Sequence, residues 1–252
     1  MGEIIAVANQ KGGVGKTTTS INLSAALAIA EKKILLIDLD PQANTTTGMG
    51  VDKSNGKMDI YSVLIGENRI NEVIKDTELK FMQIITSSRN LAKFELEVVS
   101  EDQNHLYLKN ALEAVRENFD FIIIDLPPSL GLLTINALTA AHSVLIPIQA
   151  EYYALEGLSD LINTIQRIKE NFNPLLEIKG ALLTMYDERT NLSKQVEEEL
   201  KKYFQSKLYG AVIPRSVRLS EAPSFGKPIQ LYDIKSAGAK AYMSLAKEMM
   251  KK

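Results

Sequence analysis

Short runs of apolar residues, rich in β-branched side chains, recur along the chain: IIAVA (4–8), ILLID (34–38), FIIID (121–125) and VLIPI (144–148). Continuous apolar runs of this length are typical of strands that are buried on both faces, as in a parallel sheet. Two further strands are expected at 177–185 and 208–213. The pattern therefore predicts a sheet whose strands are distributed over the whole chain.

Between these runs, apolar residues recur with the spacing of a helix that has one buried face. The segments with this spacing are 155–168, followed by the stop signal Asn173-Pro174, and the stretches 196–204 and 242–250. The buried faces of the last two are expected to consist of Val196, Leu200, Tyr203 and Phe204, and of Tyr242, Leu245, Ala246, Met249 and Met250. Alternation of strands and helices predicts an α/β fold with one doubly wound, mostly parallel sheet flanked by helices.

We expect residues 1–252 to form a single domain, because neither a low-complexity linker nor an internal repeat interrupts the pattern. The stretch 44–102 is the least regular part and is expected to decorate the sheet. The last helix has an alternative reading as a membrane-surface anchor, since it is amphipathic and ends in Lys251-Lys252. Its apolar residues have ordinary core spacing and no flexible tether precedes it, which favours a packed helix.

Composition narrows the function classes. The chain has no cysteine, which excludes disulfides, thiolate metal sites and iron–sulfur clusters. No secretory signal is visible at the N-terminus, and no apolar run approaches the roughly 18 residues of a membrane span. We therefore expect a cytoplasmic protein.

Charge is distributed unevenly along the chain. Residues 1–178 carry 15 Lys and Arg against 23 Asp and Glu, whereas residues 179–252 carry 14 against 8. This segregation indicates that the C-terminal third faces something anionic. An uneven but merely solvated surface is the alternative, and composition alone does not separate the two.

The first apolar run leads into NQKGGVGKTTTS (9–20), a glycine-rich loop that opens a helical pattern. The usual phosphate-loop pattern G-x-x-x-x-G-K-[ST] fails at one position, because Gln10 stands where the first glycine is expected. Gly12, Gly13 and Gly15 nevertheless let consecutive N–H groups point inward, as phosphate binding requires. Lys16 is expected to neutralise the outer phosphates, and Thr17 to offer its hydroxyl to Mg²⁺.

Carboxylates follow two of the other predicted strands. Asp38 and Asp40 come directly after the second run, and Asp125 ends the third. In an open parallel sheet the ligand crevice lies beyond the carboxyl ends of the strands, so these side chains are expected to converge on the phosphates. A carboxylate there holds Mg²⁺ through water or orients an attacking water.

Several stretches resemble the ParA/Soj chromosome-partitioning ATPases, which carry a deviant Walker A loop. These are KGGVGKTT, DLDPQAN, IIIDLPPSLGLLTINAL, EYYALEG, TMYDERTN and IPRSVRLSEAPSFGKPI, in the order of the family and over essentially the whole chain. The resemblance implies a P-loop NTPase that binds ATP and Mg²⁺. It also implies that the chain lacks the separate N-terminal DNA-binding domain of some family members.

The resemblance assigns roles to individual residues. Lys11 reaches across an ATP-dependent homodimer to the partner's phosphates, Asp40 positions the hydrolytic water, and Asp125 lies behind the metal. Asp38 supports the metal's water shell. The residues implied in nucleotide binding are Lys11, Gly12, Gly13, Val14, Gly15, Lys16, Thr17, Thr18, Glu151, Met185, Pro214, Arg215 and Ser216. Those implied in metal binding, partly through water, are Thr17, Asp40 and Asp125, and those implied in catalysis are Lys11, Lys16 and Asp40.

The basic C-terminal third has neither a helix-turn-helix signature nor an aromatic stacking platform, so base reading is not expected. Phosphate contacts alone give sequence-independent, salt-sensitive binding of double-stranded DNA. The resemblance implies such binding by the ATP dimer through Arg189 and Arg218. Lys227 and Lys247 belong to the same basic third and are further candidate contacts. It further implies association with the nucleoid and a ParB/Spo0J-type centromere-binding protein that stimulates hydrolysis.

Three rival functions remain open from the sequence. A MinD-type ATPase that cycles on membranes predicts a tethered C-terminal amphipathic helix. A metabolic enzyme on the same fold, such as a dethiobiotin synthetase, predicts a small-substrate pocket. A relative that positions protein clusters instead of chromosomes has the same ATPase machinery and is the hardest to separate.

Overall fold

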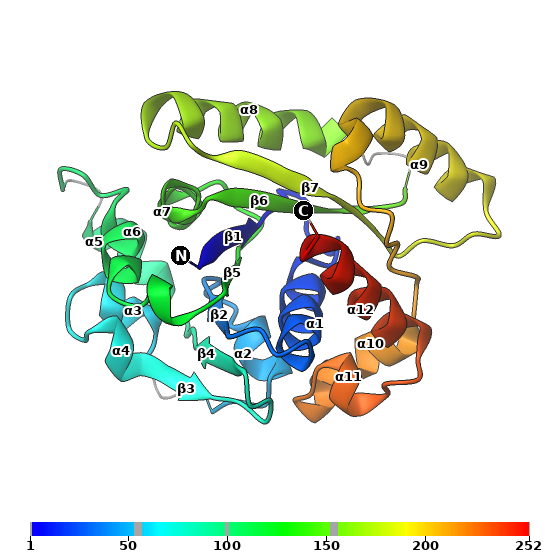
Figure 1. The fold of residues 1–252 in the computed structure, drawn as a ribbon. Helices are drawn as coiled ribbons and strands as arrows, with labels where there is room; N and C mark the ends of the chain where they lie inside the picture. Colours follow the sequence, from blue (N-terminus) through cyan, green and yellow to red (C-terminus); the bar gives the residue numbers. More distant parts are fainter. Residues whose placement is uncertain (1, 53–56, 99–100, 152–155, 252) are drawn as a thin grey trace.

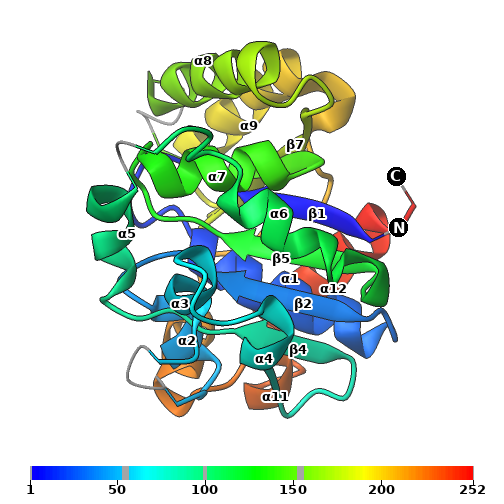
Figure 2. The ribbon, with the colours of Figure 1, turned by 90° about the vertical axis from the view of Figure 1, so that its left-hand side faces the viewer.

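The computed structural model describes residues 2–52, 57–98, 101–151 and 156–251. Within these residues seven strands form one sheet in the order β3-β4-β2-β5-β1-β6-β7. Figure 2 shows the neighbouring strands β2, β5 and β1 side by side, with β5 in the middle. The strands are β1 (Glu3–Val7), β2 (Ile34–Asp38), β3 (Ile74–Asp76), β4 (Met82–Ile85), β5 (Phe121–Asp125), β6 (Ser143–Gln149) and β7 (Glu177–Thr184). All pair in parallel except β3, which is antiparallel to β4. The predicted fold class is confirmed.

The central strands are apolar throughout because both of their faces are covered. In β1, Ile5 and Val7 pack into one hydrophobic core, while Ile4 and Ala6 pack into the other. A strand turns successive side chains to opposite faces, so a doubly covered strand needs an unbroken apolar run. That is why the runs predicted at 4–8, 34–38, 121–125 and 144–148 match β1, β2, β5 and β6 to within a residue at each end.

Helices cover both faces of the sheet (Figure 1). One face packs against α1 (Lys16–Ile29), α10 (Val217–Glu221), α11 (Ile229–Tyr232) and α12 (Ala237–Met249). The other packs against α3 (Ile60–Leu64), α5 (Leu91–Glu97), α6 (Tyr107–Glu113), α7 (Leu132–Ala140), α8 (Glu156–Asn171) and α9 (Asn191–Phe204). Shorter elements are α2 (Asn44–Gly48), α4 (Ile70–Val73) and the 3₁₀ helices η1 (Arg116–Asn118), η2 (Gln205–Lys207) and η3 (Ala222–Phe225).

The predicted helices are present, with small differences at their buried faces. Residue 155, the expected start of the first, lies outside the described residues, and α8 is described from Glu156. Tyr203 and Met250 were expected in the buried faces of the last two helices but are exposed, because each lies at the margin of its apolar stripe. None of the described helices has the length and apolar character needed to cross a membrane.

The expectation for the stretch 44–102 was wrong. This stretch extends the sheet itself, because β4 pairs in parallel with β2 and β3 pairs with β4. The run MQII of β4 is only four residues long and is interrupted by a polar residue, so its periodicity is too short to stand out. This extension matters for the site, because it places the end of β4 beside the end of β2.

The strand predicted at 208–213 was also wrong. Leu208 makes only an isolated bridge with Ala181, and the amides of Tyr209 and Ile213 donate to carbonyls of β7. The intervening amides of Gly210 and Ala211 donate instead to the two carboxylate oxygens of Glu248 in α12, at 3.0 and 3.1 Å. The segment therefore follows β7 without completing a ladder.

Replacing Glu248 with alanine is expected to lower the free energy of unfolding by about 1–3 kcal/mol, because two backbone amides lose a charged acceptor. Glu198→Ala, at an exposed position of α9, is the control and should stay within about 0.5 kcal/mol of the parent. Urea unfolding of the two variants measures the difference. Equal stabilities would show that water replaces the carboxylate without cost.

Candidate nucleotide-binding site

The glycine-rich loop connects β1 to α1 at the carboxyl end of the sheet. Gly13 and Gly15 have φ values of 77° and 90°, a left-handed conformation that residues with a Cβ avoid. A Cβ at Gly12 or Gly13 would meet no atom within 4 Å, so the loop borders open space. Because α1 begins at Lys16, its first amides have no partner within the helix and point into this space. The loop forms a cradle for an anion.

Hydrogen bonds to two other strands, β6 and β7, hold the loop in place. Asn9 Nδ2 donates to the carbonyl of Pro147 in β6 at 2.7 Å, and Asn9 Oδ1 accepts from the amide of Lys11 at 3.0 Å. At the other end, Thr184 Oγ1 in β7 donates to the carbonyl of Val14 at 2.8 Å. Asn9 and Thr184 were not assigned roles from the sequence, since their partners are far away along the chain.

Lys16 is 7% exposed and its ammonium donates to the carbonyl of Lys11 at 3.2 Å. Burial lowers the pKa of the ammonium, while the charges of Asp125 and Asp40 oppose that shift. A buried cation bonded to one carbonyl retains unused donor capacity. Lys16 is thus placed to neutralise negative charge in the cradle, as its sequence position predicts.

Asp125, at the end of β5, is fully buried and accepts three hydroxyl hydrogen bonds. The donors are Thr17 (2.8 Å), Ser20 (2.9 Å) and Thr45 (2.7 Å). Burial raises the pKa of this carboxyl, and the three hydroxyls act against the shift. The contact with Thr17 joins the two residues that were predicted to serve the metal. Ser20 and Thr45 could not be found from the sequence, because only the fold brings them to Asp125.

Asp38 and Asp40 follow β2 and have different environments. Asp38 is fully buried, and its oxygens accept from the amide of Asp40 (3.2 Å) and from the amide and hydroxyl of Thr46 (both 2.7 Å). Burial, with the charge of Asp125, raises the pKa of Asp38 to about 7. Its oxygens hold the loop that follows β2. The expected support of the metal's water shell stays a prediction.

Asp40 borders the crevice and is 8% exposed. Its Oδ1 accepts from the amide of Gln42 at 2.9 Å. Within the described residues Oδ2 accepts no hydrogen bond, so one carboxylate oxygen is available to a molecule in the crevice.

Lys11, the additional lysine, forms an ion pair with Glu151 of its own chain. Both side chains are about one-third exposed, at 39% and 31%. Glu151 follows β6, beside the phosphate loop, so the structure brings these two predicted residues together. Residues 152–155 of the adjoining EYYALEG motif lie outside the described residues.

A pocket of about 270 Å³ adjoins the loop, and it is lined by the remaining residues that were predicted to contact the nucleotide. Its lining includes Gly15, Thr18, Met185, Pro214, Arg215 and Ser216. Ile213, Leu219 and Tyr242 add apolar walls that the sequence did not indicate as ligand contacts. An apolar pocket with a few polar groups beside a phosphate cradle is suited to a nucleobase.

These residues fit a nucleotide with Mg²⁺. Gln10 Nε2 is a buried donor that has no hydrogen-bond partner in the described part of the chain, and it lies in the loop itself. The cradle, the buried ammonium of Lys16 and the Thr17–Asp125 pair supply amide, cationic and oxygen groups of the kind that phosphates and Mg²⁺ prefer. Gln10 replaces a glycine of the usual pattern without filling the cradle.

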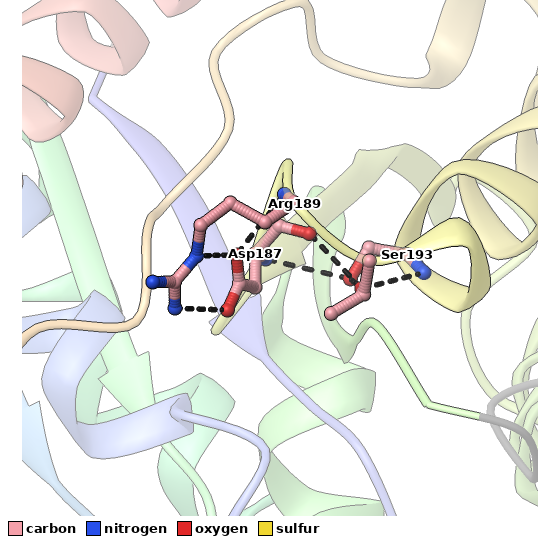
Figure 3. A network of polar contacts seen from close by, with 4 residues as sticks. Asp187, Arg189 and Ser193 are labelled. Atoms are coloured by element: carbon pink, nitrogen blue, oxygen red, sulfur yellow. Dashed lines mark hydrogen bonds and ion pairs between the residues drawn. The ribbon is translucent and has the colours of Figure 1, made fainter.

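The four predicted DNA-contacting cations lie on different elements. Arg189, in the loop after β7, donates to the carboxylate of Asp187 from Nε (2.9 Å) and Nη2 (2.7 Å). The amide of Asp187 donates to the hydroxyl of Ser193, which extends this polar network (Figure 3). This pairing lowers the pKa of Asp187 to about 2. Arg218 pairs with Glu221 (3.1 Å) and Asp233 (3.8 Å).

The other two cations lie further from Arg189. Lys227 pairs with Glu78 at 3.7 Å, and Lys247 is exposed in the last turn of α12. Arg189 and Arg215 line one surface hollow of about 770 Å³ together with Val217, which precedes Arg218. The structure thus brings Arg189, Arg215 and Arg218 to one region and leaves Lys247 at the far end of its helix.

The fold and the loop define a class of protein: a P-loop NTPase with a deviant Walker A loop. A family model described as an AAA domain matches residues 2–178. The chain is 56% identical over 249 residues to sporulation initiation inhibitor protein Soj of Bacillus subtilis, covering 99% of this chain and 98% of that protein. It is 51% identical over 252 residues to chromosome partitioning protein ParA of Myxococcus xanthus, covering 100% and 89%.

Among solved structures, cobyrinic acid a,c-diamide synthase from Mycobacterium smegmatis, with bound ATP analog and magnesium, matches with a TM-score of 0.89. It is 35% identical, and the match covers 100% of this chain and 95% of that one. The sequence relatives are more similar and match over the whole length. The chain belongs to the Soj/ParA family of chromosome-partitioning ATPases.

Proposed function

We propose that this chain is an ATP-dependent dimerising ATPase whose ATP-bound form binds DNA without sequence preference and is released by hydrolysis. The observation that carries the proposal is a complete phosphate cradle with a second lysine, Lys11, at its margin. The ammonium of Lys11 is paired with Glu151, so the Lys11 side chain is not engaged with the cradle of its own chain. A role in the partner's site would explain its presence in the loop.

Hydrolysis in this site depends on positioning and charge neutralisation. The amides of residues 12–18 and the ammonium of Lys16 bind the phosphates of ATP, and the pocket around Met185 and Pro214 binds the base. Mg²⁺, when bound through Thr17 and Asp125, neutralises further phosphate charge. Asp40 Oδ2 orients the attacking water, because this oxygen accepts no hydrogen bond from the described residues and the charge of Asp40 acts on Lys16 in the cradle.

In the proposed dimer, Lys11 leaves Glu151 and binds the phosphates in the partner's site. Breaking the Lys11–Glu151 ion pair costs little free energy, because a partly exposed surface ion pair contributes only about 0–1 kcal/mol to stability. Each site is then complete only when two chains face each other. ATP holds the dimer together, and its hydrolysis ends the association.

DNA binding is proposed for the region around Arg189, Arg215 and Arg218. A single chain offers little free positive charge there, since Asp187, Glu221 and Asp233 neutralise the arginines in part. Two chains side by side double the number of phosphate contacts, and the affinity rises steeply with that number. Binding therefore depends on the nucleotide without a separate DNA-binding domain. Lys227 and Lys247 are proposed as outer contacts.

Arg189→Ala is expected to weaken retention on unrelated double-stranded DNA several-fold with ATP, and to reduce the salt slope by about 2, because the dimer loses one phosphate contact from each chain. Lys201→Ala is the matched control, because Lys201 is also a surface cation paired with a carboxylate, Glu197, at 2.6 Å. Retention is measured with ATP and with ADP at rising salt. Equal binding in all nucleotide states would contradict the dimer-dependent model.

The proposal includes a partner of the ParB/Spo0J type that stimulates hydrolysis, and localisation to the nucleoid in the ATP state. Family membership supports both. The rate of ATP hydrolysis with and without DNA and a candidate partner tests them together. A rate that does not respond to either would favour a role apart from chromosome segregation.

A metabolic ligase is the second candidate, because a solved structure at 35% identity is described as cobyrinic acid a,c-diamide synthase. Such an enzyme needs an acceptor substrate beside the phosphates. Amide formation from cobyrinic acid with ATP tests this function directly. Product formation at a rate independent of DNA would favour the ligase over the partitioning ATPase.

A further inference from the structure

Ser87 lies just beyond the carboxyl end of β4, beside the loop that follows β2. The two strands are parallel neighbours with Ile85 opposite Ile37, so the segments after them leave the sheet side by side. Ser87 is 1% exposed, and its Oγ donates to the backbone carbonyl of Asp40 at 2.8 Å. The side chain therefore contacts the residue proposed to orient the attacking water.

The same serine is joined to Asp40 by a second route. Its amide donates to Thr46 Oγ1 at 3.0 Å, and that hydroxyl donates to Asp38 Oδ2 at 2.7 Å. Asp38 Oδ1 in turn accepts from the amide of Asp40 at 3.2 Å. Ser87, Thr46, Asp38 and Asp40 thus form a closed circuit of hydrogen bonds, and all four residues are buried.

This circuit fixes the backbone of Asp40 at both ends. Asp38 accepts from its amide, and Ser87 donates to its carbonyl. The carbonyl also accepts from the amide of Ala43 at 2.8 Å, so the turn itself survives without the serine. Loss of the Ser87 hydroxyl then removes the direct bond from Ser87 to the carbonyl of Asp40. The route through the Ser87 amide, Thr46 and Asp38 remains, and the turn keeps its local structure.

We propose that Ser87 is a positioning residue for ATP hydrolysis, which holds the Asp40 carboxylate at the place where it orients water. This inference rests on the proposed role of Asp40. Ser87 lies at the end of β4 and acts through the backbone of Asp40, away from the cradle around Gly12–Lys16. It therefore affects the rate of the chemical step and leaves the affinity for ATP unchanged. Small displacements of a positioning group have large effects on rate.

Ser87→Ala is expected to lower kcat about tenfold while the affinity for ATP-Mg²⁺ changes less than about twofold. Ser88→Ala is the matched control, because its Oγ accepts from the amide of Asn90 (3.3 Å) within its own turn. The control should keep the kcat of the parent protein. Weaker ATP binding at unchanged kcat, or an equal loss in both variants, would overturn the inference.

A second test asks whether Ser87 acts through Asp40. In an Asp40→Ala background, Ser87→Ala should leave the residual single-turnover rate unchanged, since the carboxylate it positions is gone. A further loss would show that the serine serves another group, and would overturn the inference. Should Ser87→Ala fail to fold, Thr46→Val breaks the same circuit with a similar shape and should reproduce the loss in kcat.

The outcomes separate this inference from the proposed function. If Asp40→Ala hydrolyses ATP like the parent, the proposed role of Asp40 is wrong. If Asp40→Ala is inactive while Ser87→Ala and Thr46→Val retain the parent kcat, only the role of Ser87 is wrong.

Discussion

Asp40→Ala is expected to bind ATP with nearly the parent affinity and to hydrolyse it at least about 100-fold more slowly. The carboxylate lies at the margin of the crevice, with Oδ1 held by Gln42 and Oδ2 unengaged. Among the described residues it forms no hydrogen bond or ion pair with Lys16 or the glycines of the cradle, and only its charge acts on the Lys16 ammonium. The loss should therefore fall on kcat.

The quaternary state gives a second measurement of the same variant. If hydrolysis ends the association of two chains, Asp40→Ala should accumulate as a dimer with ATP-Mg²⁺ in sedimentation velocity experiments. Asp102→Ala, which removes an exposed carboxylate elsewhere, is the control and should behave like the parent. An Asp40→Ala protein that binds ATP and stays monomeric would contradict the link between hydrolysis and dimer release.

The parts of the site that depend on adjacent residues could be predicted from the sequence. The motif NQKGGVGKTTTS predicts a phosphate-binding loop by itself, because the glycines, Lys16 and Thr17 act within one turn between a strand and a helix. Asp40 and Asp125 could be placed because parallel strands end at a common edge. The adenine-side residues, Met185 and 214–216, followed only from family resemblance, and the pocket of about 270 Å³ brings them together with Gly15 and Thr18.

The groups that hold the site together could not be predicted, since their partners are distant in sequence. Asp125 is bonded by Ser20 and Thr45, which lie 105 and 80 residues away. Ser87 contacts Asp40 across 47 residues. That contact exists because the four-residue strand β4 pairs with β2 in the sheet. The apolar pattern of β4 is too short to predict a strand from the sequence. Because β4 was not predicted, the stretch 44–102 was wrongly placed outside the sheet. For the same reason Ser87, which follows β4, was not predicted as part of the site.

The structure also distinguishes the two acidic residues at the end of β2. From their position in ILLIDLD both were expected to converge on the phosphates. Asp38 instead accepts hydrogen bonds from Thr46 and Asp40 and is fully buried, whereas Asp40 borders the crevice. One carboxylate thus supports the loop that presents the other. The difference arises because the amide and hydroxyl of Thr46 donate to Asp38, a contact that the sequence alone does not indicate.

Lys11→Ala is expected to lower the rate of ATP hydrolysis at least about 100-fold, because each site in the proposed dimer loses a cation that binds the phosphates. ATP binding to the single chain should change little, since Lys11 is paired with Glu151 there. Lys93→Ala, at an exposed position of α5, is the control for removal of a surface lysine. A Lys11→Ala protein that hydrolyses ATP like the parent would show that the cross-subunit role is wrong.

Mixing two inactive variants distinguishes a role across the dimer from a role within one chain. In a mixed dimer of Lys11→Ala and Asp40→Ala, the Lys11→Ala chain keeps its own Asp40 and receives Lys11 from its partner. One of its two sites is then complete, and equal mixing with random pairing should restore about a quarter of the parent activity. If Lys11 served only the ATP of its own chain, both sites would lack a required group. No recovery on mixing, with mixed dimers shown to form, would therefore contradict the proposal.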